Sequence, residues 1–147
     1  MKKTLSFSIV IAAPRPRVWD TMLAPDSYRQ WTEPFAPGCY YKGSWQHGET
    51  IRFLAPGGDG MVARIAENKL HETISIQHLG MVTNGIDDTT SNAVKAWAPV
   101  YENYRFLDHA GGTELQVDCD TLPHYDDFMQ KTWPLALERL KALCEAG

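Results

Sequence analysis

The chain has 147 residues, of which 44% are hydrophobic and 11% aromatic, as expected for one compact domain spanning residues 1–147. Its 14 Lys and Arg are outnumbered by 18 Asp and Glu, and the resulting net charge of −4 argues against a nucleic-acid-binding protein, which usually needs a basic face. No segment approaches the roughly 20 apolar residues that span a bilayer, so we expect no membrane insertion. Three cysteines without a CxxC pair exclude a disulfide framework and favour a reducing cytoplasm.

The amino-terminal part of the chain predicts one strand followed by two short helices. Apolar and polar residues alternate over Thr4–Ala12, which is typical of a half-buried strand. Apolar residues at three- and four-residue spacing over Val18–Leu23 predict a short amphipathic helix. A second short helix is predicted after Pro25, and it should end before Pro34 because the residue that precedes a proline is pushed out of helical geometry.

The middle of the chain predicts a series of strands separated by glycine-rich turns. The predicted strands are Tyr40–Gln46, Thr50–Leu54, Gly60–Glu67, Thr73–Leu79, Val100–Asp108 and Thr113–Asp120. Their short spacing is typical of an antiparallel meander. Residues Gly80–Ala98 show no clear periodicity, and we interpret them as a long connection that is either mobile or functional.

The carboxyl-terminal segment predicts a long amphipathic helix. Apolar residues recur at helical spacing from Phe128 to Cys144, and Asp126 and Asp127 precede them at the end where negative charge is favourable. Pro134 lies inside this pattern, and it removes a backbone donor and crowds a carbonyl group. We therefore predict a bend or a restart of the helix there.

This order of elements predicts an α+β fold: a curved antiparallel sheet of six to seven strands, two short helices after the first strand, and one long helix across the sheet. A sheet of this many strands coils as it twists. Since one helix laid across the concave face cannot fill the whole groove, we expect an internal cavity.

Several segments resemble the START-like superfamily, whose members have the helix-grip or Bet-v-1-like fold. The resemblance is carried by IVIAAPRPRVWD (Ile9–Asp20), Trp31, YRFLDHAGGTELQV (Tyr104–Val117) and WPLALERLKAL (Trp133–Leu143). It covers essentially the whole chain. Within the superfamily, the sequence is most similar to the prokaryotic homologues of the heat-shock-protein-90 ATPase activator.

The resemblance implies a seven-stranded sheet wrapped around the terminal helix, with a mainly apolar pocket between them. Members bind lipids, sterols, polyketides or other hydrophobic molecules, and a minority catalyse cyclisation or dehydration. The chaperone-activating members carry an additional amino-terminal domain, whereas this sequence begins at the predicted first strand. From the resemblance we therefore expect a small hydrophobic ligand and no cofactor, and we do not expect contact with a chaperone.

Aromatic residues and methionines converge on the predicted groove. Large aromatic and flexible side chains suit an adaptable apolar pocket, although each of them could equally be part of the core. We expect the following residues to bind the ligand: Trp31, Phe53, His78, Trp97, Tyr104, Met129 and Trp133. We expect residues 80–98 to form the lid or entrance.

Three polar residues of this region are candidates for catalysis: His78, Glu102 and Tyr104. If Ile74 and Ile76 point inward, the two-residue period of the strand turns His78 inward as well, either as a proton carrier or as a hydrogen-bonded histidine at the rim. Glu102 shares a strand face with Tyr104 and would need an arginine or histidine partner if it were buried. The strand pattern does not identify that partner.

Two further interpretations stay open beside ligand binding without catalysis, which we favour. The first is a cofactor-independent cyclase or dehydratase that uses the same cavity. The second is a stress-related interaction module that uses an exposed apolar surface; a homodimer is also left open.

We expect no metal site. His71 and His78 are seven residues apart on one predicted extended segment, so they should point to opposite faces of it. The other histidines have no second ligand at a spacing typical of zinc or iron sites.

Overall fold

The computed structural model describes residues 2–146. These residues form an α+β fold whose elements are, in chain order, β1 (Lys3–Ile11), α1 (Arg15–Leu23), α2 (Pro25–Trp31), β2 (Tyr40–Gly43), β3 (Thr50–Leu54), β4 (Gly60–Lys69), β5 (Thr73–Thr83), β6 (Ile86–Asp88), α3 (Asn92–Lys95), β7 (Val100–His109), β8 (Gly112–Thr121), a 3-10 turn (Pro123–Tyr125) and α4 (Asp126–Ala146). The predicted helix-grip arrangement is confirmed.

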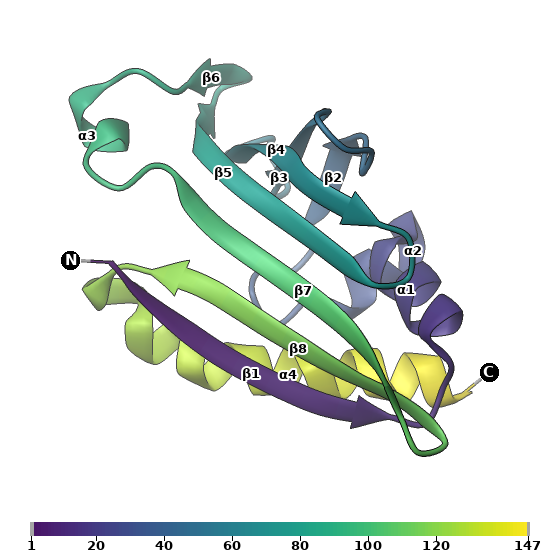
Figure 1. Ribbon diagram of the computed structural model, residues 1–147. Helices are drawn as coiled ribbons and strands as arrows, with labels where there is room; N and C mark the ends of the chain where they lie inside the picture. Colours follow the sequence, from purple (N-terminus) through teal and green to yellow (C-terminus); the bar gives the residue numbers. More distant parts are fainter. Residues whose placement is uncertain (1, 147) are drawn as a thin grey trace.

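All strand pairs of the sheet are antiparallel, and the strand order is β1-β8-β7-β5-β4-β3-β2, with β6 added beside β5. The sheet curves, and α1, α2 and α4 lie on the same side of it (Figure 1). Alternation along the strands turns one face inward, where Ile74, Ile76 and Phe106 are at most 1% exposed. The core therefore lies between this concave face and the helices.

Helix α4 packs against β1, α1 and α2. It is continuous from Asp126 to Ala146, so the predicted restart at Pro134 is wrong. Trp133 and Leu137 on either side of the proline are buried, as is Leu140 one turn further on. One missing backbone hydrogen bond does not end a helix whose apolar face is held in place by packing.

The segment 80–98 is more ordered than the sequence indicates. Strand β5 continues to Thr83, a two-residue turn follows, and β6 pairs back with β5 before helix α3. Asn84 and Gly85 adopt positive φ angles of 53° and 76°, as in the tight turns that join neighbouring strands. The prediction of one long connection over residues 80–98 is therefore wrong for its first half.

Two smaller predictions differ from the structure. Strand β2 ends at Gly43 and not at Gln46. His71 lies in the turn between β4 and β5 with a φ of 62°, outside the strand that holds His78, so the argument from alternate faces does not apply to this pair. The other predicted strands agree with the observed ones to within a few residues at their ends.

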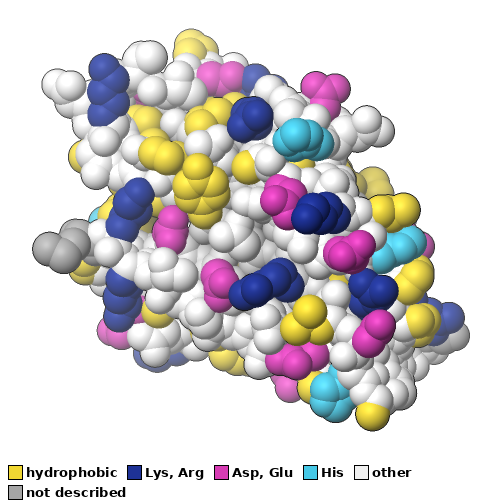
Figure 2. All heavy atoms as spheres, in the orientation of Figure 1, with side chains coloured by type: hydrophobic (Ala, Val, Ile, Leu, Met, Phe, Trp, Pro, Cys, Tyr) yellow, Lys and Arg dark blue, Asp and Glu magenta, His cyan; other side chains and the backbone are white. Residues whose placement is uncertain are grey.

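The outer face of the sheet carries charges of both signs. Figure 2 shows acidic and basic side chains intermixed over this face. Arg105 and Asp118 on neighbouring strands are 3.9 Å apart, and Arg52 contacts Asp87 of β6 at 2.5 Å. The outer face thus differs sharply from the concave face, which holds the cavity described next.

Candidate ligand-binding cavity

A cavity of about 630 Å³ lies between the concave face of the sheet, helix α2 and the first half of α4. Strands β3, β5, β7 and β8 supply one wall, and the helices supply the other. All seven residues that the sequence predicts as ligand-binding line this cavity: Trp31, Phe53, His78, Trp97, Tyr104, Met129 and Trp133. Their role in binding stays a prediction.

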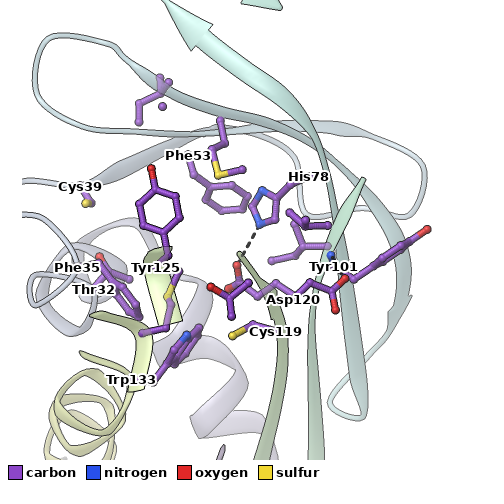
Figure 3. Close-up of a pocket in the computed structure, with 18 of the residues that line it drawn as sticks. Thr32, Phe35, Cys39, Phe53, His78, Tyr101, Cys119, Asp120, Tyr125 and Trp133 are labelled. Atoms are coloured by element: carbon purple, nitrogen blue, oxygen red, sulfur yellow. Dashed lines mark hydrogen bonds and ion pairs between the residues drawn. The ribbon is translucent and has the colours of Figure 1, made fainter. Parts of the chain in front are cut away.

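The walls are largely aromatic, and the rings contact one another. Trp133 lies 6.3 Å from Trp31 and 6.1 Å from Tyr104 between ring centroids, and Phe53 lies 5.6 Å from His78. Figure 3 shows Phe53 beside His78 on one side of the cavity and Trp133 near Cys119 on another. Rings with few rotatable bonds that pack on each other form a rigid lining.

His78, Glu102 and Tyr104 form one hydrogen-bonded group in this lining. Ile76 pairs with Glu102 and His78 pairs with Val100 in the β5–β7 ladder, so His78 and Glu102 are diagonal neighbours on the inner face. Nε2 of His78 is 3.1 Å from Oε1 of Glu102, an interaction marked by the dashed line in Figure 3. The Tyr104 hydroxyl donates to Oε2 of the same carboxylate. The partner that the sequence leaves open is therefore His78.

The charge of Glu102 raises the pKa of groups on three elements: Tyr104 on β7, Tyr28 on α2 and Cys119 on β8. Burial raises the pKa of Tyr104 well above its ordinary value, and the Glu102 carboxylate raises it further. The same two causes, in the same order, raise the pKa of Tyr28 on α2. Both phenols therefore keep their protons at neutral pH and can donate hydrogen bonds inside the cavity.

Cys119 is not a nucleophile in this setting. Burial, followed by the Glu102 carboxylate, raises the pKa of its thiol to about 12, against a weaker opposite effect of the nearby Trp133 indole. Since the thiolate is the reactive form, a thiol with this pKa is inert at neutral pH. This agrees with the interpretation of Cys119 as a packing residue.

Three buried nitrogen atoms of lining residues make no hydrogen bond within the described part of the chain: Trp45 Nε1, His78 Nδ1 and Trp133 Nε1. By contrast, Nε1 of Trp31 donates to the Met22 carbonyl at 3.0 Å. A buried polar atom without a partner costs about 1–3 kcal/mol. Three lining side chains thus keep unused hydrogen-bonding capacity among the described residues, whereas Trp31, which also lines the cavity, is satisfied.

The sequence misses several lining residues. Tyr28 is three residues before Trp31 on α2, so the two share a helix face, and this spacing could have identified Tyr28. Asp59, Asp120 and Tyr125 lie at turns and strand ends, where a residue pattern says little about position in space. Of residues 80–98, β6 and α3 do not line the cavity, and only residues near the two ends of the segment do.

No three His, Cys, Asp or Glu side chains gather in a metal-binding arrangement within residues 2–146. In the same range, no helix has the length and apolar character needed to cross a bilayer.

Comparison with protein families gives one decisive match. The family described as Activator of Hsp90 ATPase homolog 1-like protein matches residues 12–145. The chain belongs to this family. Every residue that lines the cavity lies inside the matched range. None of the curated proteins compared with this member of the Hsp90 ATPase activator homologue family is significantly similar to it.

Solved structures similar to this family member share its fold at low sequence identity. Protein MLL2253 from Mesorhizobium loti is 14% identical with a TM-score of 0.76, and the match covers 98% of each chain. An Aha1 dimer from Colwellia psychrerythraea is 18% identical with a TM-score of 0.72 over 97% of this chain and 96% of the other. DynU16, a protein in the dynemicin biosynthetic locus, is 16% identical with a TM-score of 0.70 over 97% of this chain and 47% of its own.

Proposed function

We propose that the protein binds a small, mainly hydrophobic molecule in the cavity between the sheet and α4. The observation that carries this proposal is the cavity itself: its volume of about 630 Å³ lies within the roughly 300–1,000 Å³ usual for small-molecule sites, and its walls are predominantly aromatic and aliphatic. The fold likeness to DynU16 from a biosynthetic locus is compatible with a small-molecule ligand.

Burial of apolar area supplies the driving force for such binding. A ligand that buries about 200 Å² of apolar surface gains about 5 kcal/mol before the entropic cost of association, at about 25 cal/mol per Å². The polar group of His78, Glu102 and Tyr104 would fix the orientation of the ligand, because these three side chains are hydrogen-bonded to one another on the inner face of the sheet among the aromatic rings.

Native mass spectrometry of the purified protein, followed by organic extraction, tests the proposal. We expect a co-purifying hydrophobic compound, or a rise in melting temperature with members of a hydrophobic library. Met129→Trp should block the cavity and abolish both signals, whereas Leu135→Trp on the exposed side of the same helix should preserve them. Protein that repeatedly purifies without a ligand, and whose melting temperature does not change with any library compound, would contradict the proposal.

The native mass spectrum also tests whether the protein forms a homodimer, which the solved Aha1 dimer from Colwellia supports.

A second candidate function is cofactor-independent acid–base catalysis in the same cavity. It is favoured by the hydrogen-bonded group, in which an imidazole and a phenol both contact one carboxylate. If the protein is an enzyme, compounds that bind should be converted over time, and His78→Ala should abolish conversion. Bound compounds that are recovered unchanged after long incubation would contradict catalysis and leave binding intact.

A further inference from the structure

The residues that line the cavity include no Lys or Arg, and the acidic ones are Asp59, Glu102 and Asp120. Of these three, Glu102 has its side chain on the inner face of the sheet with the aromatic lining, whereas Asp59 is exposed in the turn between β3 and β4, and Asp120 lies on the outer side of β8 beside Thr4. The two histidines of the lining are His78, beside Glu102, and His124, near α4. The inner part of the cavity therefore holds one carboxylate and no Lys or Arg.

None of the three carboxylates has a Lys or Arg within salt-bridge distance among the described residues. Asp59 accepts from the backbone N–H of Asn84 at 3.0 Å. Asp120 accepts from the Thr4 hydroxyl at 2.8 Å and from the backbone N–H of Tyr101 at 2.9 Å. Neutral donors orient these two carboxylates but leave their charges uncompensated.

Glu102 lies on the inner face of β7, paired with the buried Ile76 of β5. Its side chain is 25% exposed and contacts His78 and Tyr104. Its charge contributes to the raised pKa of Tyr28 on α2, of Tyr104 on β7 and of Cys119 on β8, so the negative potential extends from the sheet across to the helix side of the cavity.

The aromatic lining adds to this potential. Tyr28 lies 5.7 Å from Trp31 and 6.1 Å from Phe53 between ring centroids, and all three rings line the cavity with the carboxylate. The face of an aromatic ring carries partial negative charge and attracts cations within about 6 Å of its centroid. A desolvated carboxylate among such rings is the usual chemistry for recognising an organic cation.

We propose that the ligand is a hydrophobic amine whose ammonium group binds at Glu102 while its apolar body occupies the aromatic part of the cavity. This inference rests on the proposed function and narrows it to a chemical class. A fatty acid or another hydrophobic anion would bring a carboxylate towards Glu102 with no Lys or Arg in the lining to receive it. A neutral ligand would gain no electrostatic attraction from the charge of Glu102.

Three probes with one ring system test the inference: 2-(aminomethyl)naphthalene, 2-naphthalenemethanol and 2-naphthoate. Calorimetry on the unmodified protein at pH 8, where a free imidazole is neutral, gives their affinities. We expect the amine to bind about tenfold or more tightly than the alcohol, and the carboxylate to bind most weakly. An alcohol that equals the amine, or a carboxylate that exceeds it, would overturn the amine inference and leave hydrophobic binding standing. Failure of all three probes would count against the proposed function itself.

A variant that removes the charge of Glu102 tests whether this residue causes the preference for the amine. Glu102→Gln should reduce the affinity for the amine at least about fivefold more than the affinity for the alcohol. Asp118→Asn is the matched control, because Asp118 lies on the neighbouring strand β8 and is absent from the lining, and it should preserve the order of the probes. An unchanged amine preference in a folded Glu102→Gln protein would refute the assignment to Glu102. If that variant does not fold, the order of the probes on the unmodified protein still decides the ligand class.

Discussion

Substitutions of Trp31 and Trp133 test how much a hydrogen bond of a buried indole nitrogen contributes to stability. Both side chains are 3% exposed and both line the cavity. The indole N–H of Trp31 donates to the Met22 carbonyl, whereas that of Trp133 has no partner among the described residues. Changing each tryptophan to phenylalanine removes the N–H and a similar amount of buried ring.

The two variants should differ strongly in stability. Each loses about 1 kcal/mol from the smaller apolar area, at about 25 cal/mol per Å². Trp31→Phe also breaks a hydrogen bond and leaves the Met22 carbonyl without that donor, which costs a further amount of about 1–3 kcal/mol. Trp133→Phe instead removes an N–H that makes no hydrogen bond by geometry and has only the sulfur of Cys119, a weak acceptor, nearby, so no comparable bond is lost. We expect Trp31→Phe to be less stable than Trp133→Phe by at least about 1 kcal/mol.

Urea denaturation of the two variants and the unmodified protein measures this difference as free energies of unfolding. In thermal unfolding it should appear as a gap of at least roughly 2–4 °C between the two variants, at about 2–4 °C per kcal/mol for a chain of this length. Equal free energies of unfolding, or a Trp133→Phe variant that is the less stable of the two, would refute the reasoning from the unpaired N–H.

Three further predictions concern other parts of the fold. Gly80→Ala should destabilise the protein by more than about 1 kcal/mol in urea denaturation, because the added Cβ would lie 2.0 Å from the Asp88 carbonyl oxygen; an unchanged midpoint would contradict this close approach. Cys119 should resist iodoacetamide at pH 8 in the folded protein and react after unfolding, as mass spectrometry of the labelled peptides would show; rapid labelling of the native thiol would contradict its raised pKa. Arg52 lowers the pKa of Asp87, so this pair stabilises the fold above the pKa of a free aspartate and ceases to do so as the pH falls through the lowered value. Arg52→Gln should therefore reduce the free energy of unfolding by about 0.2–1 kcal/mol at pH 6, and this loss should shrink as the pH falls below the ordinary aspartate pKa of 3.8; a loss that stays constant as Asp87 becomes protonated would show that another interaction is responsible.

The sequence predicts most of the fold because its signals are local. The two-residue period of the strands and the helical spacing of residues 128–144 depend on neighbours in the chain, and they identify the elements and their inner faces. The hairpin at Asn84-Gly85 is missed even though Asn-Gly is a strong turn signal. Gly80, which allows the close approach of β6, interrupts the alternation there and hides the continuation of β5.

The site is only partly predictable for the same reason. Alternation turns His78, Glu102 and Tyr104 inward, but their mutual contacts depend on the register of β5 against β7, which no local pattern encodes. The predicted strands offer Arg52, Arg64 and Arg105 as partners for Glu102, and alternation does not choose among them. In the structure, Arg52 contacts Asp87 and Arg105 contacts Asp118. The absence of Lys and Arg from the lining likewise becomes visible only when residues distant in the chain lie together.

The rings that line the cavity also hold the molecule together. Trp31, Tyr104 and Trp133 belong to the main buried cluster, so the same side chains line the cavity and stabilise the fold. Substitutions of these residues that change the shape of the cavity should therefore also weaken the packing of α4 against the sheet. Tyr125 and Phe128 at the rim are half exposed, so substitutions there should change the lining of the cavity at a smaller cost in stability.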